Sequence, residues 1–173
     1  MPGPADELPS VPDEDLAHIQ AGIEIGVDLV ALQLRLAGGD ALADLDQARI
    51  APRGHAIECR LYAENPAKMF LPSPGKLNRL ALPAPSAQVR IDTGVREGDT
   101  ITAYYDPMIA KLICHGPDRD AALAATEAAL RECEIAGIAN NIDFLGRVVR
   151  HPAFRAGEVF TGFIETYKNE LLG

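Results

Sequence analysis

The spacing of apolar residues changes part-way along this 173-residue chain. Up to about residue 114, short segments rich in β-branched and apolar residues are separated by Pro, Gly and Asp. From residue 118 onward, apolar side chains recur every three or four positions. A period of two is typical of strands and a period near 3.6 is typical of helices. The chain is therefore predicted to be an α+β domain, in which a small antiparallel sheet is covered by helices.

Residues 55–62 form the first predicted strand. Because successive side chains of a strand point to opposite sides, this strand would have two different faces. One face would be polar and face a site, with Ala56, Glu58 and Arg60 on it. The other would be apolar, with Ile57, Cys59 and Leu61 on it. Further short strands are predicted at residues 77–82, 89–92, 100–104 and 108–114.

Helices are predicted on both sides of these strands. Helical spacing over residues 13–36 is weakened by two glycines in the middle, so two helices are expected there. Asp28 would cap the second, at residues 28–37, because its carboxylate can accept the unpaired amide protons of the first turn, and Gly38-Gly39 would end it. After the strands, helices are predicted at residues 118–134, 140–150 and 160–171.

Bulk properties exclude several functions. A net charge of -9 and a pI near 4.8 disfavour nucleic acid as a partner, because binding a phosphate backbone needs clustered cations. No apolar run reaches the roughly 18 to 20 residues of a membrane span, and no signal peptide is found, so a soluble, cytoplasmic protein is expected. Residues 1–12, with four prolines and two acids, predict a disordered leader.

Known catalytic and metal motifs are missing from the sequence. There is no glycine-rich phosphate loop, no GxSxG elbow and no helical HExxH. The three cysteines, Cys59, Cys114 and Cys133, have no CxxC spacing and no nearby His pair, so they are predicted to be reduced, mostly buried thiols. No metal site is predicted.

Three side chains are candidates for chemistry. Arg60 offers a planar fork of donors that suits a carboxylate, bicarbonate or enolate oxygen, but spacing alone favours a structural ion pair. His55 could act as an acid or base, although an ordinary hydrogen-bonded histidine is the commoner case. Lys111 could be a biotin or lipoyl acceptor, but its expected mid-strand position disfavours this, since acceptor lysines stand at exposed hairpin tips.

Two segments have turn chemistry. The LPSPGK run at Leu71–Lys76 has two prolines and a permissive glycine, which predicts a rigid, exposed loop. The YYDP run at Tyr104–Pro107 could line a pocket, but Asp followed by Pro is also typical of a turn in which the Asp side chain bonds local amides. Composition favours the turn.

Several motifs in this order resemble the C-terminal domain of biotin carboxylases. They are Gly54–Arg60 (GHAIECR), Ala63–Pro66 (AENP), Phe70–Lys76 (FLPSPGK) and Tyr105–Ile113 (YDPMIAKLI). The resemblance begins at Gly26–Val30 (GVDLV) and covers roughly residues 26 to 168. The pattern at Asp92–Val95 and Glu97–Asp99 is most similar to the biotin carboxylase part of acetyl-, propionyl- or methylcrotonyl-CoA carboxylases.

This resemblance implies an activity for the complete enzyme. Such enzymes use ATP, Mg and bicarbonate to make carboxyphosphate and pass its carbon dioxide to biotin on a carrier protein, which then serves carboxyltransferase subunits. In the family motif the arginine matches Arg60, near bicarbonate and biotin, where a fixed cation stabilises charge on the ureido oxygen. His55, Glu58, the Leu71–Lys76 loop and Asp106 would be framework. The implied fold is a rudimentary barrel-sandwich sheet packed with C-terminal helices.

One departure from the family limits what this sequence is expected to do. The conserved ATP-grasp ending should lie just before Gly26, where the sequence reads LAHIQAGI at Leu16–Ile23, and none of its catalytic side chains can be matched. The implied organisation is a leader at 1–12, a helical lead-in at 13–53 resembling the end of the ATP-grasp region, and a C-terminal-like domain at 54–173. Without metal carboxylates, the chain alone is predicted to be inactive and to bind no cofactor.

Three functional hypotheses follow from these residues. In the first, the chain is the biotin-site part of a carboxylase and supplies Arg60 in trans to an ATP-grasp half. In the second, it is a non-catalytic interaction module or degenerate fragment that keeps the fold and binds carboxylase subunits. In the third, it is a biotin carrier with Lys111 as acceptor.

Overall fold

A computed structural model of the chain describes residues 28–39 and 53–172. These belong to two compact units, with the division between Ala51 and Pro52. None of the helices in the described ranges is long and apolar enough to cross a membrane. The predicted leader at 1–12 and the predicted helix before residue 28 lie outside the described residues.

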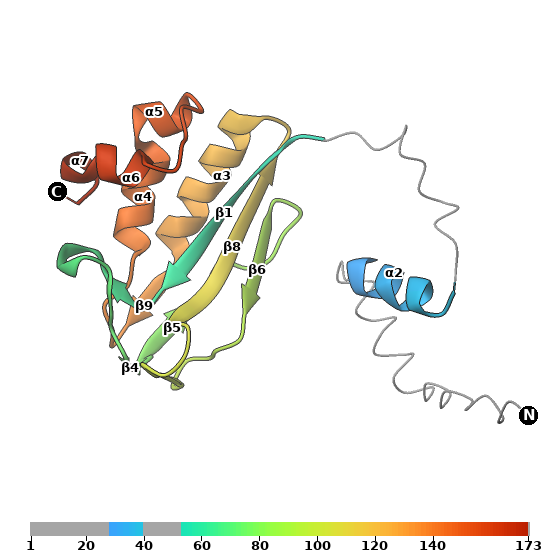
Figure 1. Cartoon of the computed structure of the whole chain (residues 1–173), viewed down its shortest axis with the longest axis horizontal. Helices are drawn as coiled ribbons and strands as arrows, with labels where there is room; N and C mark the ends of the chain where they lie inside the picture. The colour runs from blue at the N-terminus through green and yellow to red at the C-terminus, as the bar shows by residue number, and fades with distance from the viewer. Residues whose placement is uncertain (1–27, 40–52, 173) are drawn as a thin grey trace, which may run out of the picture. The chain divides into compact units, whose positions relative to one another are not determined.

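The described part of the first unit is helix α2, Asp28–Ala37, at the predicted place (Figure 1). The backbone N–H of Gly38 donates to the carbonyl of Leu34 at 2.9 Å, and that of Gly39 donates to Leu36 at 3.0 Å. Gly39 has a φ of 95°, which glycine adopts without strain. The two glycines therefore end the helix as predicted. The Asp28 side chain is outside the described part, so its capping role stays a prediction.

The second unit mixes strands and helices, which confirms the α+β prediction. Its strands are β1 His55–Tyr62, β2 Glu64–Asn65, β3 Leu71–Pro72, β4 Gly75–Lys76, β5 Arg79–Ala81, β6 Val89–Thr93, β7 Thr100–Ile101, β8 Met108–Gly116 and β9 Glu134–Ala136. Its helices are η2 Pro66–Lys68, α3 Arg119–Glu132, α4 Ile142–Arg150, α5 Pro152–Arg155, α6 Phe163–Thr166 and α7 Lys168–Leu172.

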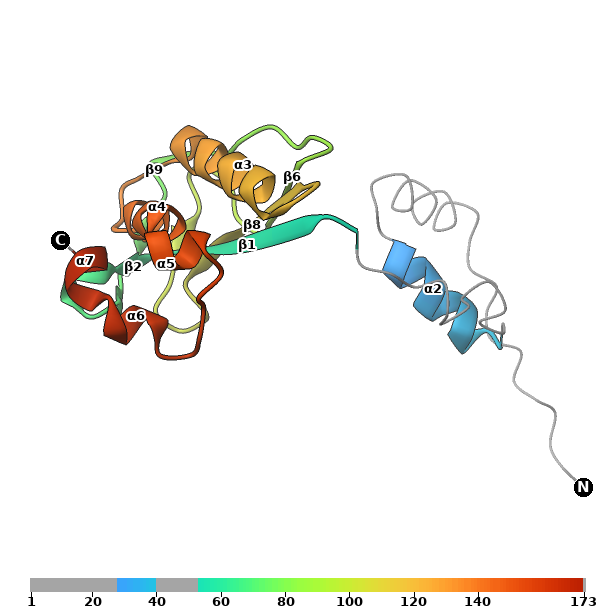
Figure 2. The same cartoon turned by 90° about the horizontal axis from the view of Figure 1, so that it is seen from above.

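The main sheet has three antiparallel strands in the order β1-β8-β6. Its central strand β8 pairs along its whole length with β1, from His55 opposite Gly116 to Tyr62 opposite Met108. Helix α3 packs against one face of this sheet (Figure 2). That face is apolar and forms the core, in which Leu61 and Leu112 of the sheet and Leu123 of α3 are fully buried.

The remaining strands form three two-stranded ladders, β2-β3, β4-β7 and β5-β9, instead of extending one sheet. Some of these strands are shorter than predicted, since the strand expected over 100–104 ends at Ile101. Strand β9 was not predicted. Ser73 fixes the loop around it through two hydrogen bonds. The backbone N–H of Ser73 donates to the carbonyl of Ala63 at 2.7 Å, and the Ser73 Oγ accepts the N–H of Ala139 at 3.0 Å. Prolines and glycines limit each ladder to two or three residues.

The C-terminal helices follow the predicted pattern with two differences. Helix α3 begins after Asp118, whose carboxylate accepts the N–H of Ala121 at 2.8 Å, as expected of a cap. The helix predicted over 160–171 is instead two short helices, α6 and α7, because Tyr167 leaves helical geometry between them. The short helix α5 was missed, although Pro152 is compatible with a first helical position.

Gly137 allows β9 to approach the chain beside β4 closely. Its φ is 102°, and a Cβ added there would lie 2.2 Å from the carbonyl oxygen of Lys76 and 2.9 Å from the backbone N of Asn78. Both neighbouring atoms belong to the backbone, so they cannot move aside as a flexible side chain can. The N–H of Asn78 also donates to Ala136 at 2.9 Å, and this bond depends on the same approach.

Gly137→Ala is expected to lower the free energy of unfolding by roughly 2–4 kcal/mol, because it combines a left-handed backbone with a backbone clash. Gly98→Ala is the matched control, since Gly98 has a φ of 92° and no atom within 4 Å of the added Cβ. It should cost only roughly 1 kcal/mol. Urea unfolding measures both. Equal costs for the two variants would contradict the close approach.

Candidate functional site

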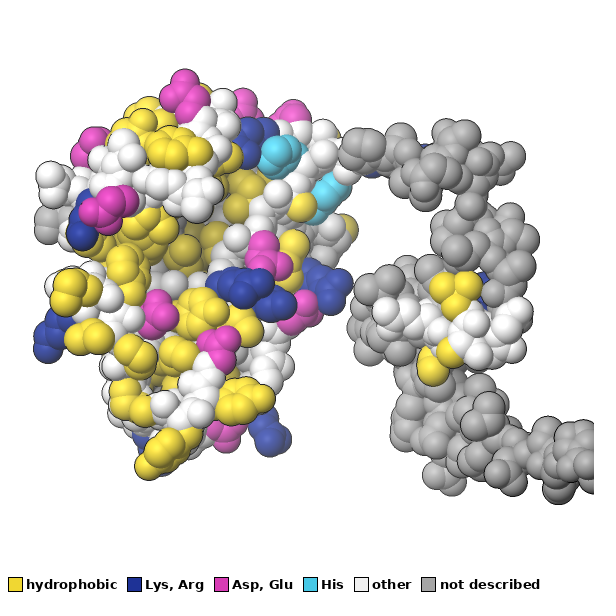
Figure 3. Space-filling model, viewed as in Figure 1, with side chains coloured by type: hydrophobic (Ala, Val, Ile, Leu, Met, Phe, Trp, Pro, Cys, Tyr) yellow, Lys and Arg dark blue, Asp and Glu magenta, His cyan; other side chains and the backbone are white. Residues whose placement is uncertain are grey.

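The face of the main sheet opposite α3 carries the candidate site. Along β1, Ile57, Cys59 and Leu61 are buried, whereas Ala56, Glu58 and Arg60 are exposed, which confirms the predicted alternation. The strand register adds residues from two other strands to the exposed side. We call this surface the open face, formed by Ala56, Glu58, Arg60, Arg90, Asp92, Lys111, Ile113 and His115. Figure 3 shows positive and negative side chains gathered over these strands.

Arg60 is paired on the open face but is not buried. Its Nε donates to the Oε1 of Glu58 at 3.1 Å, and the side chains are 54% and 43% exposed. The hydrogen bond to Glu58, followed by the interaction with Tyr62, raises the pKa of the Arg60 guanidinium. Arg60 is therefore always charged. A guanidinium has five donors, and the bond to Glu58 uses one of them.

Asn141 fixes the backbone that carries Arg60. Its side-chain Nδ2 donates to the Arg60 carbonyl at 3.0 Å, and its Oδ1 accepts the N–H of Tyr62 at 2.9 Å. Asn141 is 6% exposed and immediately precedes α4. It therefore closes the outer edge of β1 and holds Arg60 in position. Residue spacing gave no indication of this role.

Lys111 lies mid-strand in β8, as predicted, which disfavours a role as an exposed carrier lysine. Its Cα partners are Arg60 on one side and Asp92 on the other. Residues directly opposite each other in an antiparallel sheet share a face, so Lys111 lies on the open face between these two residues. The register thus brings together two candidates, Arg60 and Lys111, which are 51 positions apart in the sequence.

A groove of about 460 Å³ adjoins Lys111 at one end of the sheet. Its lining includes Asp92, Tyr105, Asp106 and Lys111. The Oδ1 of Asp106 accepts the N–H of Met108 at 3.0 Å, which confirms the predicted turn chemistry. Tyr104 and Tyr105 are 96% and 87% exposed. Asp106 therefore makes the predicted turn, and with Tyr105 it also lines the groove, so the two interpretations of this run are both met.

His55 belongs to the framework and lies at the other end of β1. Its Nε2 is 3.0 Å from the Nη1 of Arg119, and a guanidinium can only donate, so this nitrogen of His55 accepts. Arg119 also donates to the carbonyls of Arg155, at 3.1 Å, and of Phe154, and lies over the Phe154 ring at 5.2 Å. His55 thus helps connect β1 to the end of α5.

The cysteines are free, as predicted. Burial is the main cause that raises the pKa of Cys59 to about 12 and that of Cys133 to about 11, so neither thiol ionises at neutral pH. Within residues 28–39 and 53–172, no three His, Cys, Asp or Glu side chains converge as metal ligands would.

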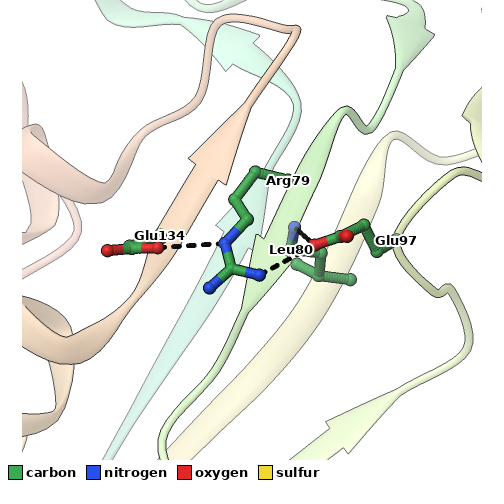
Figure 4. Close-up of polar contacts among 4 residues, drawn as sticks. All are labelled: Arg79, Leu80, Glu97 and Glu134. Carbon is green, nitrogen blue, oxygen red and sulfur yellow. Dashed lines mark hydrogen bonds and ion pairs between the residues drawn. The ribbon is translucent and has the colours of Figure 1, made fainter.

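A second charged cluster has a structural role. Arg79 on β5 pairs with Glu134 on β9 at 3.0 Å and with Glu97 at 3.3 Å, and Glu97 also accepts the N–H of Leu80 at 3.1 Å (Figure 4). These bonds join β5, β9 and the turn before β7. All the ion-pair members are exposed, and the two carboxylates engage the Nε and Nη1 of Arg79.

Comparison with protein families identifies the domain. The family described as the biotin carboxylase C-terminal domain matches residues 58–166, more than half of the chain. The chain belongs to the biotin carboxylase C-terminal domain family. The family resemblance noted from the motifs is thereby confirmed, and so is the fold class.

Curated relatives of this biotin carboxylase domain are subunits of acyl-CoA carboxylases. Methylcrotonoyl-CoA carboxylase subunit alpha, mitochondrial, of Dictyostelium discoideum is 48% identical over 84% of this chain and 21% of its own length. The propionyl-CoA carboxylase alpha chain of Ruegeria pomeroyi is 44% identical over 80% of this chain and 23% of its own length. The chain thus spans about a fifth of the length of these relatives.

Solved structures agree with this membership. The biotin carboxylase domain dimer of the Hydrogenobacter thermophilus 2-oxoglutarate carboxylase, in complex with MgADP, ADP and bicarbonate, superposes with a TM-score of 0.76 at 34% identity, over 80% of this chain and 30% of that one. The Kluyveromyces lactis urea carboxylase superposes with a TM-score of 0.71 at 42% identity, over 79% and 12%. In both cases this chain matches only part of the solved chain.

Glu97→Gln is expected to remove a pH-dependent part of the stability. The N–H of Leu80, with a further contribution from Arg79, lowers the pKa of Glu97 below its usual value. A lowered folded-state pKa stabilises the fold above the unfolded pKa of about 4.5, and this stabilisation is lost as the pH falls through the folded value. The variant should therefore be less stable than wild type at pH 7.

Urea unfolding between pH 7 and pH 3 measures this effect, and the difference between Glu97→Gln and wild type should shrink as the pH falls. Glu158→Gln changes an exposed carboxylate that has no ion pair among the described residues, so it serves as the control. If the difference in free energy of unfolding between wild type and Glu97→Gln stays constant from pH 7 to pH 3, the Glu97 carboxylate does not stabilise the fold in this way.

Proposed function

We propose that this chain is the C-terminal part of a biotin carboxylase subunit of an acyl-CoA carboxylase, and that Arg60 acts at its bicarbonate and biotin site. One observation carries the proposal. Arg60 projects half-exposed from the open face, with its Nε held by Glu58 and its backbone held by Asn141. Exposed ion pairs add little stability, so the pair with Glu58 is better explained by orientation of the guanidinium than by folding.

A guanidinium held in this way suits oxyanion chemistry. Its remaining N–H donors can bind bicarbonate, or an oxygen on which negative charge develops during carboxylation. Because Arg60 is fixed before the reaction, it does not have to reorganise when that charge appears. The role of Glu58 is then to position Arg60, and that of Asn141 is to hold the strand.

The cofactors of the complete enzyme would be biotin, ATP, Mg and bicarbonate. The open face offers cations suited to the anionic reactant. We assign nucleotide and metal binding to an ATP-grasp polypeptide outside these 173 residues. Biotin, when bound, supplies the nitrogen that accepts the carboxyl group.

The partners would be this ATP-grasp half, a biotin carrier protein and carboxyltransferase subunits. Exposed apolar side chains support contacts with other polypeptides, since Phe160 is 53% exposed, Val159 is 52% exposed and Ile164 is 43% exposed. The same exposure also supports the alternative of a non-catalytic interaction module. A cytoplasmic location stays a prediction, because the relatives include mitochondrial proteins.

Mixing the chain with a separately made ATP-grasp half should give carboxylation of free biotin in the presence of ATP, magnesium and bicarbonate. Arg60→Ala should lower this rate by at least about 100-fold, as expected when one preorganised donor is removed from an anionic transition state. Arg96→Ala removes an exposed cation outside the open face and should keep the rate.

Association of the two halves is measured in parallel by analytical ultracentrifugation. Activity in the mixture that is lost in Arg60→Ala supports the proposal. Association without any activity contradicts it and favours the interaction module. Full activity in Arg60→Ala would show that Arg60 does not act at the site, while the proposal that the two polypeptides together form a biotin carboxylase would stand.

A further inference from the structure

Two cations lie directly opposite each other on the open face. Arg60 of β1 and Lys111 of β8 are Cα partners. The Arg60 carbonyl and the Tyr62 N–H bond to Asn141, on the side of β1 away from β8. Arg60 and Lys111 therefore form a non-hydrogen-bonded pair, the closer of the two pair types, with Cα atoms roughly 4.5 Å apart. Like charges in this arrangement repel and destabilise a sheet.

The neighbouring carboxylates do not neutralise Lys111. Asp92, its Cα partner on the other side, pairs with the Nε of Arg90 at 3.0 Å. Asp106, which shares the groove with Lys111, accepts the Met108 N–H. Glu58 is bonded to Arg60. Across the described ranges, Lys111 forms no ion pair and no side-chain hydrogen bond.

Lys111 is also less exposed than a typical surface lysine. It is only partly accessible and sits on the central strand of the sheet, with strands on both sides. Its ammonium group has three donors, and Lys111 is one of the residues that line the groove. A half-buried cation next to a second cation, with the nearby acids engaged elsewhere, lacks a negative partner.

We infer that Arg60 and Lys111 bind one oxyanion between them, of the bicarbonate, carboxylate or phosphate class. This inference rests on the proposed function of the open face and adds Lys111 to it. The planar guanidinium would bind two oxygens of the anion and the ammonium a third, so the anion offsets the repulsion between the cations. Glu58 holds the Nε of Arg60 and leaves the outer donors for the ligand.

The anion titration uses the full chain labelled with 15N and 13C. Bicarbonate, acetate and phosphate are added separately at constant ionic strength, with chloride as the balancing salt. The Arg60 Nε–H signal and the Lys111 side-chain carbon signals should shift together and saturate. Lys111→Gln and Arg60→Gln should each raise the Kd at least about fivefold, as expected for one charge-assisted hydrogen bond. Lys111→Arg should keep binding.

Arg96→Gln is the matched control, since Arg96 is an exposed cation off the sheet and its loss should leave the Kd unchanged. The three anions identify the ligand: tighter binding of bicarbonate or acetate indicates a carboxyl group, and tighter binding of phosphate indicates a phosphoryl group. An unchanged Kd in Lys111→Gln, or equal shifts at Lys111 and Arg96, would overturn the inference.

These outcomes are distinct from failure of the proposed function. Loss of binding in Arg60→Gln but not in Lys111→Gln would remove Lys111 alone from the site. If no anion gives a saturable shift, the two-cation site is rejected. The activity of the mixed halves tests the proposed function in a separate experiment. Activity of the mixed halves without this binding would reject the two-cation site and leave the proposed function standing.

Discussion

The packing of one sheet face against α3 is the interaction on which the site depends. Leu61, Leu112 and Leu123 are fully buried there, and burying each such side chain contributes roughly 1.5–3 kcal/mol. Exposed ion pairs, such as Arg60 with Glu58, contribute at most about 1 kcal/mol. The apolar face therefore fixes the register, and because side chains alternate along a strand, it also decides which residues reach the open face.

A slip of one position would bury Arg60 and expose the leucines, so the site cannot move independently of the core. Asn141 adds a local restraint, since it bonds the backbone on both sides of Leu61. Arg119 and Arg79 act elsewhere, joining β1 to the end of α5 and joining β5 to β9. The charged residues thus divide into connectors, whose side chains join elements of the fold, and the open-face cations Arg60 and Lys111, which do not.

Much of this architecture could be predicted from local patterns. The alternation at residues 55–62, the alanine-rich helix and its Asp118 cap, and the turn at Asp106 all depend on neighbours in the sequence. The opposition of Arg60 and Lys111 depends on pairing between distant strands, which periodicity does not specify. The bonds of Asn141 span about 80 positions and could not be inferred for the same reason. The family resemblance pointed to Arg60, but not to the contacts that Arg60 makes.

On the proposed function, the open face lines an active site that is shared with an ATP-grasp polypeptide, so Arg60 should become inaccessible when that polypeptide binds. Modification by phenylglyoxal, located by mass spectrometry, tests it directly, because Arg60 is half-exposed in the chain alone. An ATP-grasp polypeptide with bicarbonate should protect Arg60 while leaving Arg96 reactive. If Arg60 reacts at the same rate with and without the associated partner, the open face does not line that site.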